Sequence, residues 1–280
     1  MTHKVAFIGG GKMATALIGG IITNGTDPRS IYVYDPNTEQ CRLLSDTFGV
    51  NATSLSNEVP TACDCIIWAV KPQSLRNAAE ALIAKFSSAL HISIAAGIRI
   101  KTLQTIFQSR RVIRAMPNTP ALIGAGVTAL FSGDAVTEHD KNHATLILQS
   151  TGYTFWVEDD QRMDAVTALS GSGPGYVFHF IESLINSAIA LGFNADDARK
   201  LTLLTMQGSV AQALESTDSV SLLRQAVTSP GGTTEAGLSV MNQWRIHDAM
   251  VATLQSACSR AAELGDEFEL SIHELSPAER

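Results

Sequence analysis

Two short stretches combine glycines with the start of a predicted helix, and either could bind an anion. The first is FIGGGKMATA at residues 7–16, and the second is TSPGGTTEAG at residues 228–237. Glycines permit a tight turn, and the helix that follows offers free backbone N–H groups and a partial positive charge to a negative ligand. The sequence therefore contains two candidate anion-binding turns in one chain of 280 residues.

The first stretch has the spacing of a dinucleotide-binding turn. Gly9, Gly11 and Ala14 form G-x-G-x-x-A between a predicted strand and a predicted helix. In this pattern the glycines admit a pyrophosphate and the alanine lets the helix pack closely on the sheet. A phosphate loop of the Walker type is excluded, because it requires glycine and a hydroxyl residue where Ala6 and Met13 stand.

The residue types after the second predicted strand leave the choice of dinucleotide open. Asp35 ends that strand, where a carboxylate normally accepts hydrogen bonds from the adenosine ribose and favours NAD. Asn37, Thr38 and Arg42 follow closely enough to serve the 2′-phosphate of NADP instead. A 2′-phosphate would be repelled by Asp35 unless that side chain turns away.

The second stretch has two interpretations from its pattern alone. Pro230 fixes the approach of the chain, and Gly231 and Gly232 allow a backbone too tight for a Cβ. Such a turn is either an ordinary helix cap or a site for a small anion, and the residues do not decide between them.

The elements that must position the first turn alternate in type. β-branched runs predict strands, and amphipathic segments between them predict helices, so the first half is typical of a parallel sheet with helices on both faces. The predicted strands are 4–9, 30–35, 65–70, 91–97, 111–116, 126–132 and 151–157, and the predicted helices are 12–24, 37–48, 73–86, 101–108 and 137–149. The predicted fold class is α/β, with a Rossmann-type doubly wound sheet over residues 1–160.

Beyond residue 160 the pattern predicts helices only, at 174–191, 195–215, 220–227, after the Gly231–Gly232 turn, and at 247–264, where Gly265 would end the helix. The polar residues 266–280 are expected to be loosely ordered. Several of these helices are apolar around much of their circumference, so we expect residues 161–280 to form a helical domain buried against a second subunit.

Charge and composition exclude several classes of partner. The net charge of −7 comes entirely from residues 161–280, since acidic and basic residues balance in 1–160. Neither half is basic, so we expect no nucleic acid and no anionic membrane as partner. No apolar run is long enough to span a bilayer, and the start of the sequence lacks a signal-peptide pattern, so a cytoplasmic location is the expectation.

The cysteines do not have the spacing of a metal site. Cys41, Cys63, Cys65 and Cys258 form no C-x-x-C pair, and no histidine lies near Cys63 or Cys65 in the sequence. We expect reduced cysteines, with Cys63 and Cys65 half-buried, and no metal.

Five motifs together resemble the pyrroline-5-carboxylate reductase family over nearly the whole chain. They are FIGGGKMA at the start, IIWAVKPQ (66–73), MPNTP (116–120), LSGSGPGYVF (169–178) and VTSPGGTTEAG (227–237). The resemblance implies reduction of the cyclic imine 1-pyrroline-5-carboxylate to L-proline by a nicotinamide cofactor. It also implies a helical domain that forms an intertwined homodimer, which in this family often assembles further into a larger ring of dimers.

The resemblance also implies roles for individual residues. Those expected to bind the cofactor are Gly9, Gly11, Lys12 and Met13 at the pyrophosphate, Asp35, Asn37 and Asn57 near the ribose, and Val70, Lys71, Pro72 and Ala96 along the cleft. Those expected near the nicotinamide and the substrate are Met116, Asn118, Gly231, Gly232, Thr233 and Thr234. Many family members carry Ser, Thr or Asn at the position of Asp35. Asp35 therefore weakens the family's usual preference for NADPH in this chain; NADP(H) is still expected, with NAD(H) possible.

Thr234 is the expected catalytic residue. Backbone N–H groups around Gly231–Thr234 suit the substrate carboxylate, and the Thr234 hydroxyl would hydrogen-bond the ring nitrogen and orient the imine. No strong acid is required, because a protonated imine accepts hydride readily and the proton can come from solvent. The SGSGPG segment has two open interpretations: it walls the substrate pocket, or it breaks a helix so that two protomers can pack.

Two other functions compete with this one. A β-hydroxyacid dehydrogenase shares the opening turn and a helical second domain, but it relies on a lysine of that domain. Here Lys200 is the only lysine beyond residue 160, and the glycine-rich pattern that should precede it is absent. A non-catalytic dinucleotide sensor is the second alternative, and turnover of the imine would separate it from an enzyme.

Overall fold

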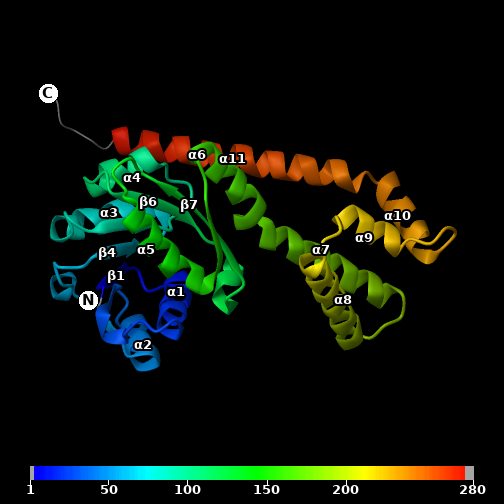
Figure 1. Cartoon of the computed structure of the whole chain (residues 1–280), viewed down its shortest axis with the longest axis horizontal. Helices are drawn as coiled ribbons and strands as arrows, with labels where there is room; N and C mark the ends of the chain where they lie inside the picture. Colours follow the sequence, from blue (N-terminus) through cyan, green and yellow to red (C-terminus); the bar gives the residue numbers. More distant parts are fainter. Residues whose placement is uncertain (1–2, 275–280) are drawn as a thin grey trace. The chain divides into compact units, whose positions relative to one another are not determined.

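The computed structural model describes residues 3–274. Among these residues, one sheet of eight strands has the order β3-β2-β1-β4-β5-β6-β7-β8. Figure 1 shows strands of this sheet with helices around them. The strands are β1 (Val5–Ile8), β2 (Ile31–Tyr34), β3 (Asn51–Thr53), β4 (Cys65–Trp68), β5 (Leu90–Ser93), β6 (Val112–Met116), β7 (Gly126–Ser132) and β8 (Gly152–Trp156). The predicted doubly wound α/β fold is confirmed.

Helices cover both faces of this sheet and form two separate hydrophobic cores. They are α1 (Lys12–Thr23), α2 (Thr38–Phe48), α3 (Pro72–Leu82), α4 (Ile100–Phe107), α5 (Glu138–Leu148) and α6 (Asp160–Val166). Alternate residues of β1 divide between the cores, because successive strand side chains point to opposite faces. Phe7 packs in the core that includes α1, α2 and α5 residues, and Ile8 packs in the core that includes α3 and α4 residues.

Two details of the sheet differ from the sequence prediction. The three-residue strand β3 was not predicted, and β7 pairs antiparallel with β6, whereas a parallel sheet was expected. The segment between β6 and β7 explains the reversal, because it is shorter than the roughly dozen residues that a parallel crossover requires. Strand β8 then returns parallel to β7 through α5.

Five further helices follow the sheet. They are α7 (Gly173–Ala190), α8 (Ala195–Glu215), α9 (Val220–Ala226), α10 (Thr233–Gln243) and α11 (Ile246–Glu274). By contacts the described chain forms two compact units: a sheet unit, up to Ser172 and again from Ala257, and a helical unit, Gly173–Ser256. This division differs from the predicted domain boundary at residue 160. The separate functional roles expected for residues 1–160 and 161–280 stay a prediction.

The end of the last helix differs from the prediction. Helix α11 continues through Gly265 to Glu274, whereas the sequence analysis ended it at Gly265 and expected loose order beyond. The glycine serves packing here, because a Cβ at this position would lie 3.1 Å from Nε of Arg99. The next residue, Asp266, pairs with the same arginine at 2.9 Å and holds the helix on the sheet unit. Residues 275–280 of that prediction lie outside the described residues.

Two further expectations concern buried groups and membranes. Cys63 and Cys65 are free and fully buried, at 6% and 0% exposure, and not half-buried as predicted. Within the described part of the chain, no helix combines the length and the apolar character needed to cross a bilayer. The same residues contain no group of three His, Cys, Asp or Glu side chains placed to hold a metal ion.

Candidate active site: two glycine turns and the carboxyl edge of the sheet

The first glycine turn joins β1 to α1 and has the geometry of a pyrophosphate cradle. Gly9 has a φ of +99°, and a Cβ there would lie 2.7 Å from the backbone oxygen of Ala69. Gly11 is the N-cap of α1, and no side chain caps this helix end. The space beside Gly11 is open, so a phosphate can reach the first N–H groups of α1, at Lys12 and Met13. These residues fit a dinucleotide.

Two side chains bind the backbone N–H and carbonyl of Gly10 in this turn: Asp35, directly after β2, and Gln40, on α2. The carboxylate of Asp35 accepts hydrogen bonds from the N–H of Gly10 at 2.7 Å and from the N–H of Asn37 at 2.9 Å. The amide of Gln40 donates to the carbonyl of Gly10 at 2.6 Å. Gln40 was not among the predicted residues, because a contact across thirty residues leaves no mark in a local motif.

The other predicted cofactor residues lie where neighbouring strands end. Lys71 and Pro72 are the N-cap and first residue of α3, just after β4, and Ala96 follows β5. Asn57 lies exposed in the turn η2 (Ser56–Glu58) after β3, and Asn37 caps α2 after β2. Because these strands are parallel neighbours, their carboxyl ends share one edge of the sheet, which is where dinucleotides bind in such folds.

The MPNTP and LSGSGPG motifs meet at the end of β6. The Asn118 amide donates to both the carbonyl and the hydroxyl oxygen of Ser170, each at 3.1 Å, and accepts from the N–H of Val127 at 2.8 Å. Gly171 leaves room for Met116, since a Cβ there would lie 2.6 Å from its Cε. Ser170 and Gly171 belong to a single π-helical turn, η6 (Thr167–Gly171). Asn118 is therefore satisfied by protein groups, and its amide fixes the shape of this edge.

The second glycine turn opens α10 in the helical unit. Gly231 has a φ of +70°, and its N–H donates to the carboxylate of Glu235 at 2.8 Å. Gly232 is the N-cap, and no side chain caps the N–H groups of Thr233 and Thr234. Both threonines are exposed. The turn can therefore take an anion, although one of its donors is already paired with a carboxylate of the same helix.

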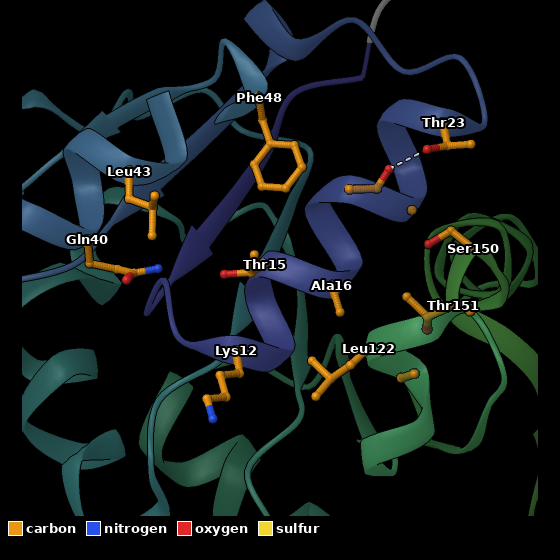
Figure 2. Close-up of a pocket in the computed structure, with 14 residues that line it drawn as sticks. Lys12, Thr15, Ala16, Thr23, Gln40, Leu43, Phe48, Leu122, Ser150 and Thr151 are labelled. Atoms are coloured by element: carbon orange, nitrogen blue, oxygen red, sulfur yellow. Dashed lines mark hydrogen bonds between the residues drawn. The ribbon is translucent and has the colours of Figure 1, made fainter. Parts of the chain in front are cut away.

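A groove of about 700 Å³ runs along α1, and Figure 2 shows the side chains that line it. Its walls are mostly apolar or small, with Leu43 and Phe48 from α2 on one side and Leu122 on the other. Lys12 is the only predicted cofactor residue among its lining residues. The groove is therefore not the predicted cofactor cleft, which follows the strand ends.

Comparisons with known proteins cover both halves of the chain. Residues 4–97 match the family described as NADP oxidoreductase, coenzyme F420-dependent, and residues 160–264 match the family described as pyrroline-5-carboxylate reductase dimerisation. A pyrroline-5-carboxylate reductase of Vibrio alginolyticus is 35% identical over 268 residues, covering 94% of this chain and 98% of its own.

Two solved structures agree with this result. The pyrroline-5-carboxylate reductase of Coxiella burnetii has a TM-score of 0.88 at 36% identity, covering 94% of this chain and 99% of its own. The enzyme of Plasmodium falciparum, solved with NADP bound, has a TM-score of 0.83 at 30% identity, covering 94% of this chain and 98% of its own. The sheet, both glycine turns and these full-length relatives lead to one conclusion: the chain belongs to the pyrroline-5-carboxylate reductase family.

Proposed function

We propose that this protein reduces 1-pyrroline-5-carboxylate to L-proline, the last step of proline synthesis, with NADPH as the preferred reductant and NADH as a possible one. The observation that carries the proposal is membership of the family over 94% of the chain, with both glycine turns present. NADP is bound to the Plasmodium falciparum relative, and the family that matches residues 4–97 is described as an NADP oxidoreductase.

The cofactor side of the proposal rests on the sheet unit. The N–H groups of Lys12 and Met13 would bind the pyrophosphate at the start of α1. Asp35 would lie beside the adenosine ribose, although both of its oxygens already accept hydrogen bonds from the backbone of the loop. Because the carboxylate is held by Gly10 and Asn37, its negative charge is partly offset before a 2′-phosphate approaches. Val70, Lys71, Pro72 and Ala96 would line the remaining cleft, with Met116 nearest the nicotinamide.

The substrate side of the proposal rests on the second glycine turn. The N–H groups of Thr233 and Thr234 would bind the substrate carboxylate, and Gly231 and Gly232 would let it approach. The Thr234 hydroxyl would hydrogen-bond the ring nitrogen and orient the imine carbon. A bound reduced nicotinamide supplies the hydride, and water supplies the proton that the ring nitrogen carries in L-proline. Orientation of the two reactants accounts for most of the rate enhancement under this proposal.

The proposal includes a homodimer formed through the helical unit. Large apolar side chains of this unit are exposed in the single chain, among them Phe178 at 64%, Leu214 at 81% and Trp244 at 74%. Many large apolar side chains exposed on one unit are typical of a subunit interface. A larger ring of dimers and a cytoplasmic location remain part of the proposal; the four free cysteines fit a reducing compartment.

The assay that tests the function follows the absorbance of NADPH or NADH when 1-pyrroline-5-carboxylate is added. We expect oxidation of the cofactor with formation of L-proline, faster with NADPH. A sensor would bind the cofactor without turnover. A β-hydroxyacid dehydrogenase would instead reduce NADP⁺ on addition of a β-hydroxy acid; Lys200, on α8, is the only lysine in the described helical unit.

A further inference from the structure

A network of five charges lies in the sheet unit; its centre, Arg114 and Asp164, is buried, and its outer member Asp266 is exposed. Arg114 on β6 is only 2% exposed and pairs with Asp160 and with Asp164, the latter at 3.5 Å. Asp164 is 4% exposed and also pairs with Arg99 at 3.3 Å. Arg99 pairs in turn with Asp266 on α11 at 2.9 Å. Asp164 therefore forms ion pairs with two arginines at once.

The network lies close in the sequence to the two points where the chain passes between the compact units. The chain leaves the sheet unit after Ser172 and returns to it at Ala257. Asp160 and Asp164 lie on α6, shortly before the exit, and Asp266 lies on α11, shortly after the return. Arg99 also donates to the carbonyl of Ala262 on α11 at 3.2 Å. The outgoing and returning helices are thus attached to the sheet unit by one set of charges.

The outgoing helix leads directly to the edge of the active site. The π-helical turn η6 follows α6 without a break, and the N–H of Ser172 closes it on the carbonyl of Thr167 at 2.8 Å. This turn presents Ser170 to Asn118 and Gly171 to Met116. An extra residue in a helical turn is costly and is often found at functional sites, where it redirects side chains. Here it aims two small residues at the end of β6.

We propose that Arg114 and Asp164 are positioning residues of the reductase site: their buried ion pair sets the orientation of η6, and η6 fixes Met116 and Asn118 beside the nicotinamide. This inference rests on the proposed function. Arg114 and Met116 lie on the same strand and point to the same side, since they are two residues apart. The Arg114–Asp164 ion pair and the turn η6 therefore both hold the end of β6, on the face where Arg114 and Met116 lie.

Ion pairs suit this role better than apolar packing. A buried pair adds little net stability over apolar packing, because desolvation offsets its attraction, but its geometry is directional. Asp164 must face both Arg99 and Arg114, which fixes the rotation of α6 about its axis. An apolar contact would tolerate a small rotation, and a displacement of about 1 Å at a reacting group can lower a rate about 100-fold.

The chain offers a matched control for this proposal. Arg111 pairs with Asp140, which is 1% exposed, at 2.5 Å just before the same strand begins. This pair also joins an arginine to a buried aspartate, although Arg111 itself is partly exposed, and it lies at the opposite end of β6 from Met116. Asp164→Asn and Asp140→Asn therefore remove equivalent charges at two ends of one strand.

The experiment compares these variants in the full-length protein at saturating NADPH and 1-pyrroline-5-carboxylate. We expect Asp164→Asn to lower kcat about tenfold or more and to leave the NADPH dissociation constant unchanged, because the Gly9–Gly11 turn is untouched. Asp140→Asn should keep kcat within about twofold, although both variants lower the melting temperature. Equal kcat values for the two folded variants would overturn the proposal.

Two more measurements keep the test decisive. Gly171→Ala adds a methyl group where Met116 lies and leaves every charge in place, so it should lower kcat in the same direction. If Asp164→Asn does not fold, Arg114→Lys replaces it, because a lysine cannot bridge Asp160 and Asp164 together. Unchanged kcat in both of these variants would also overturn the proposal.

Hydrogen exchange separates this proposal from the proposed function. The N–H of Val127 donates to Asn118, so its exchange reports directly on the position of that amide. Asp164→Asn should speed the exchange of Val127 and of residues 167–172, and Asp140→Asn should not. A wild-type protein with no activity would sink the proposed function, whereas unchanged exchange in Asp164→Asn would sink the positioning role.

Discussion

The turn at Gly9 and Gly10 is buried in the sheet unit, whereas the turn at Gly231 and Gly232 lies at an exposed helix start. The first is held by Asp35 and Gln40 from a neighbouring strand and helix. The second is held only within its own segment, by Glu235. The first turn is therefore held by contacts with residues far away in the sequence, and the second depends on local hydrogen bonds. We expect changes at the first turn to affect folding and cofactor binding together, and changes at the second to affect substrate binding with a smaller loss of stability.

The largest expected effect comes from replacing a glycine with alanine in each turn and comparing the two losses. Gly9→Ala places a Cβ 2.7 Å from a backbone oxygen at a φ of +99°, so we expect NADPH binding to weaken at least about 100-fold and stability to fall by about 2–4 kcal/mol. Gly231→Ala has open space around its Cβ and only the strain of a positive φ, about 1–2 kcal/mol. Titration of NADPH fluorescence and thermal unfolding measure both. Equal losses of NADPH affinity in the two variants would contradict this difference between the two turns.

A second expectation places acid sensitivity in the sheet unit. His91 on β5 is fully buried, and burial lowers its pKa from 6.5 to about 4; its Nδ1 accepts from Nε1 of Trp68 at 3.2 Å. Between these values the unfolded chain binds a proton that the folded chain excludes, so stability falls as the pH drops from 6.5 toward 4, by about 3 kcal/mol in total.

Urea unfolding at a series of pH values measures this loss. His91→Phe has no proton to gain at this position, so its stability should fall much less over the same range, with a constant cost from the lost Trp68 hydrogen bond. The remaining slope comes in part from His143, whose pKa burial also lowers. A further loss should follow at lower pH, because Arg111 lowers the pKa of Asp140 from 3.8 to about 2 and that stabilisation is lost as the pH falls through this range. A flat wild-type profile between pH 6.5 and 4 would rule out the neutral buried histidine.

The third prediction tests the substrate turn. Thr234→Ala should lower kcat by roughly 10- to 100-fold, the size of one hydrogen bond to a charged group, without changing the NADPH dissociation constant. Thr234→Ser keeps the hydroxyl and should recover most of the rate. Steady-state kinetics with both reactants varied gives the two constants. A Thr234→Ala enzyme with the wild-type rate would remove this hydroxyl from the mechanism.

The smallest expected effect concerns the carboxylate that already occupies the second turn. Glu235→Gln keeps an oxygen that accepts from Gly231 but removes a negative charge from beside the bound substrate carboxylate. We expect the KM for the imine to fall about fivefold, from a repulsion of about 1 kcal/mol between two carboxylates near water. Glu263→Gln, on α11, is the control and should leave KM unchanged. A higher KM in Glu235→Gln would mean that the charge supports the turn more than it repels the substrate.

The features that the sequence predicts correctly are those whose physical cause lies within a few neighbouring residues. The G-x-G-x-x-A turn and the alternating strands were predicted because their spacing carries the physics within a few residues. The end of α11 was predicted wrongly, since a glycine after a helix normally ends it, and here packing of Gly265 against Arg99 overrides that preference. The ion pairs of Asp164 with Arg99 and Arg114 connect distant segments, and a charged residue within the strand run RVIRAM was their only sign in the sequence.

We propose that the first glycine turn binds the cofactor and the second binds the substrate of a single reductase. The most direct measurement mixes the protein with NADPH and 1-pyrroline-5-carboxylate, follows the loss of NADPH absorbance, and quantifies L-proline in the same sample. We predict one L-proline formed for each NADPH oxidised, with Thr234→Ala binding NADPH normally but turning over slowly. NADPH binding without any L-proline, under conditions where the folded wild-type protein is present, would contradict the account.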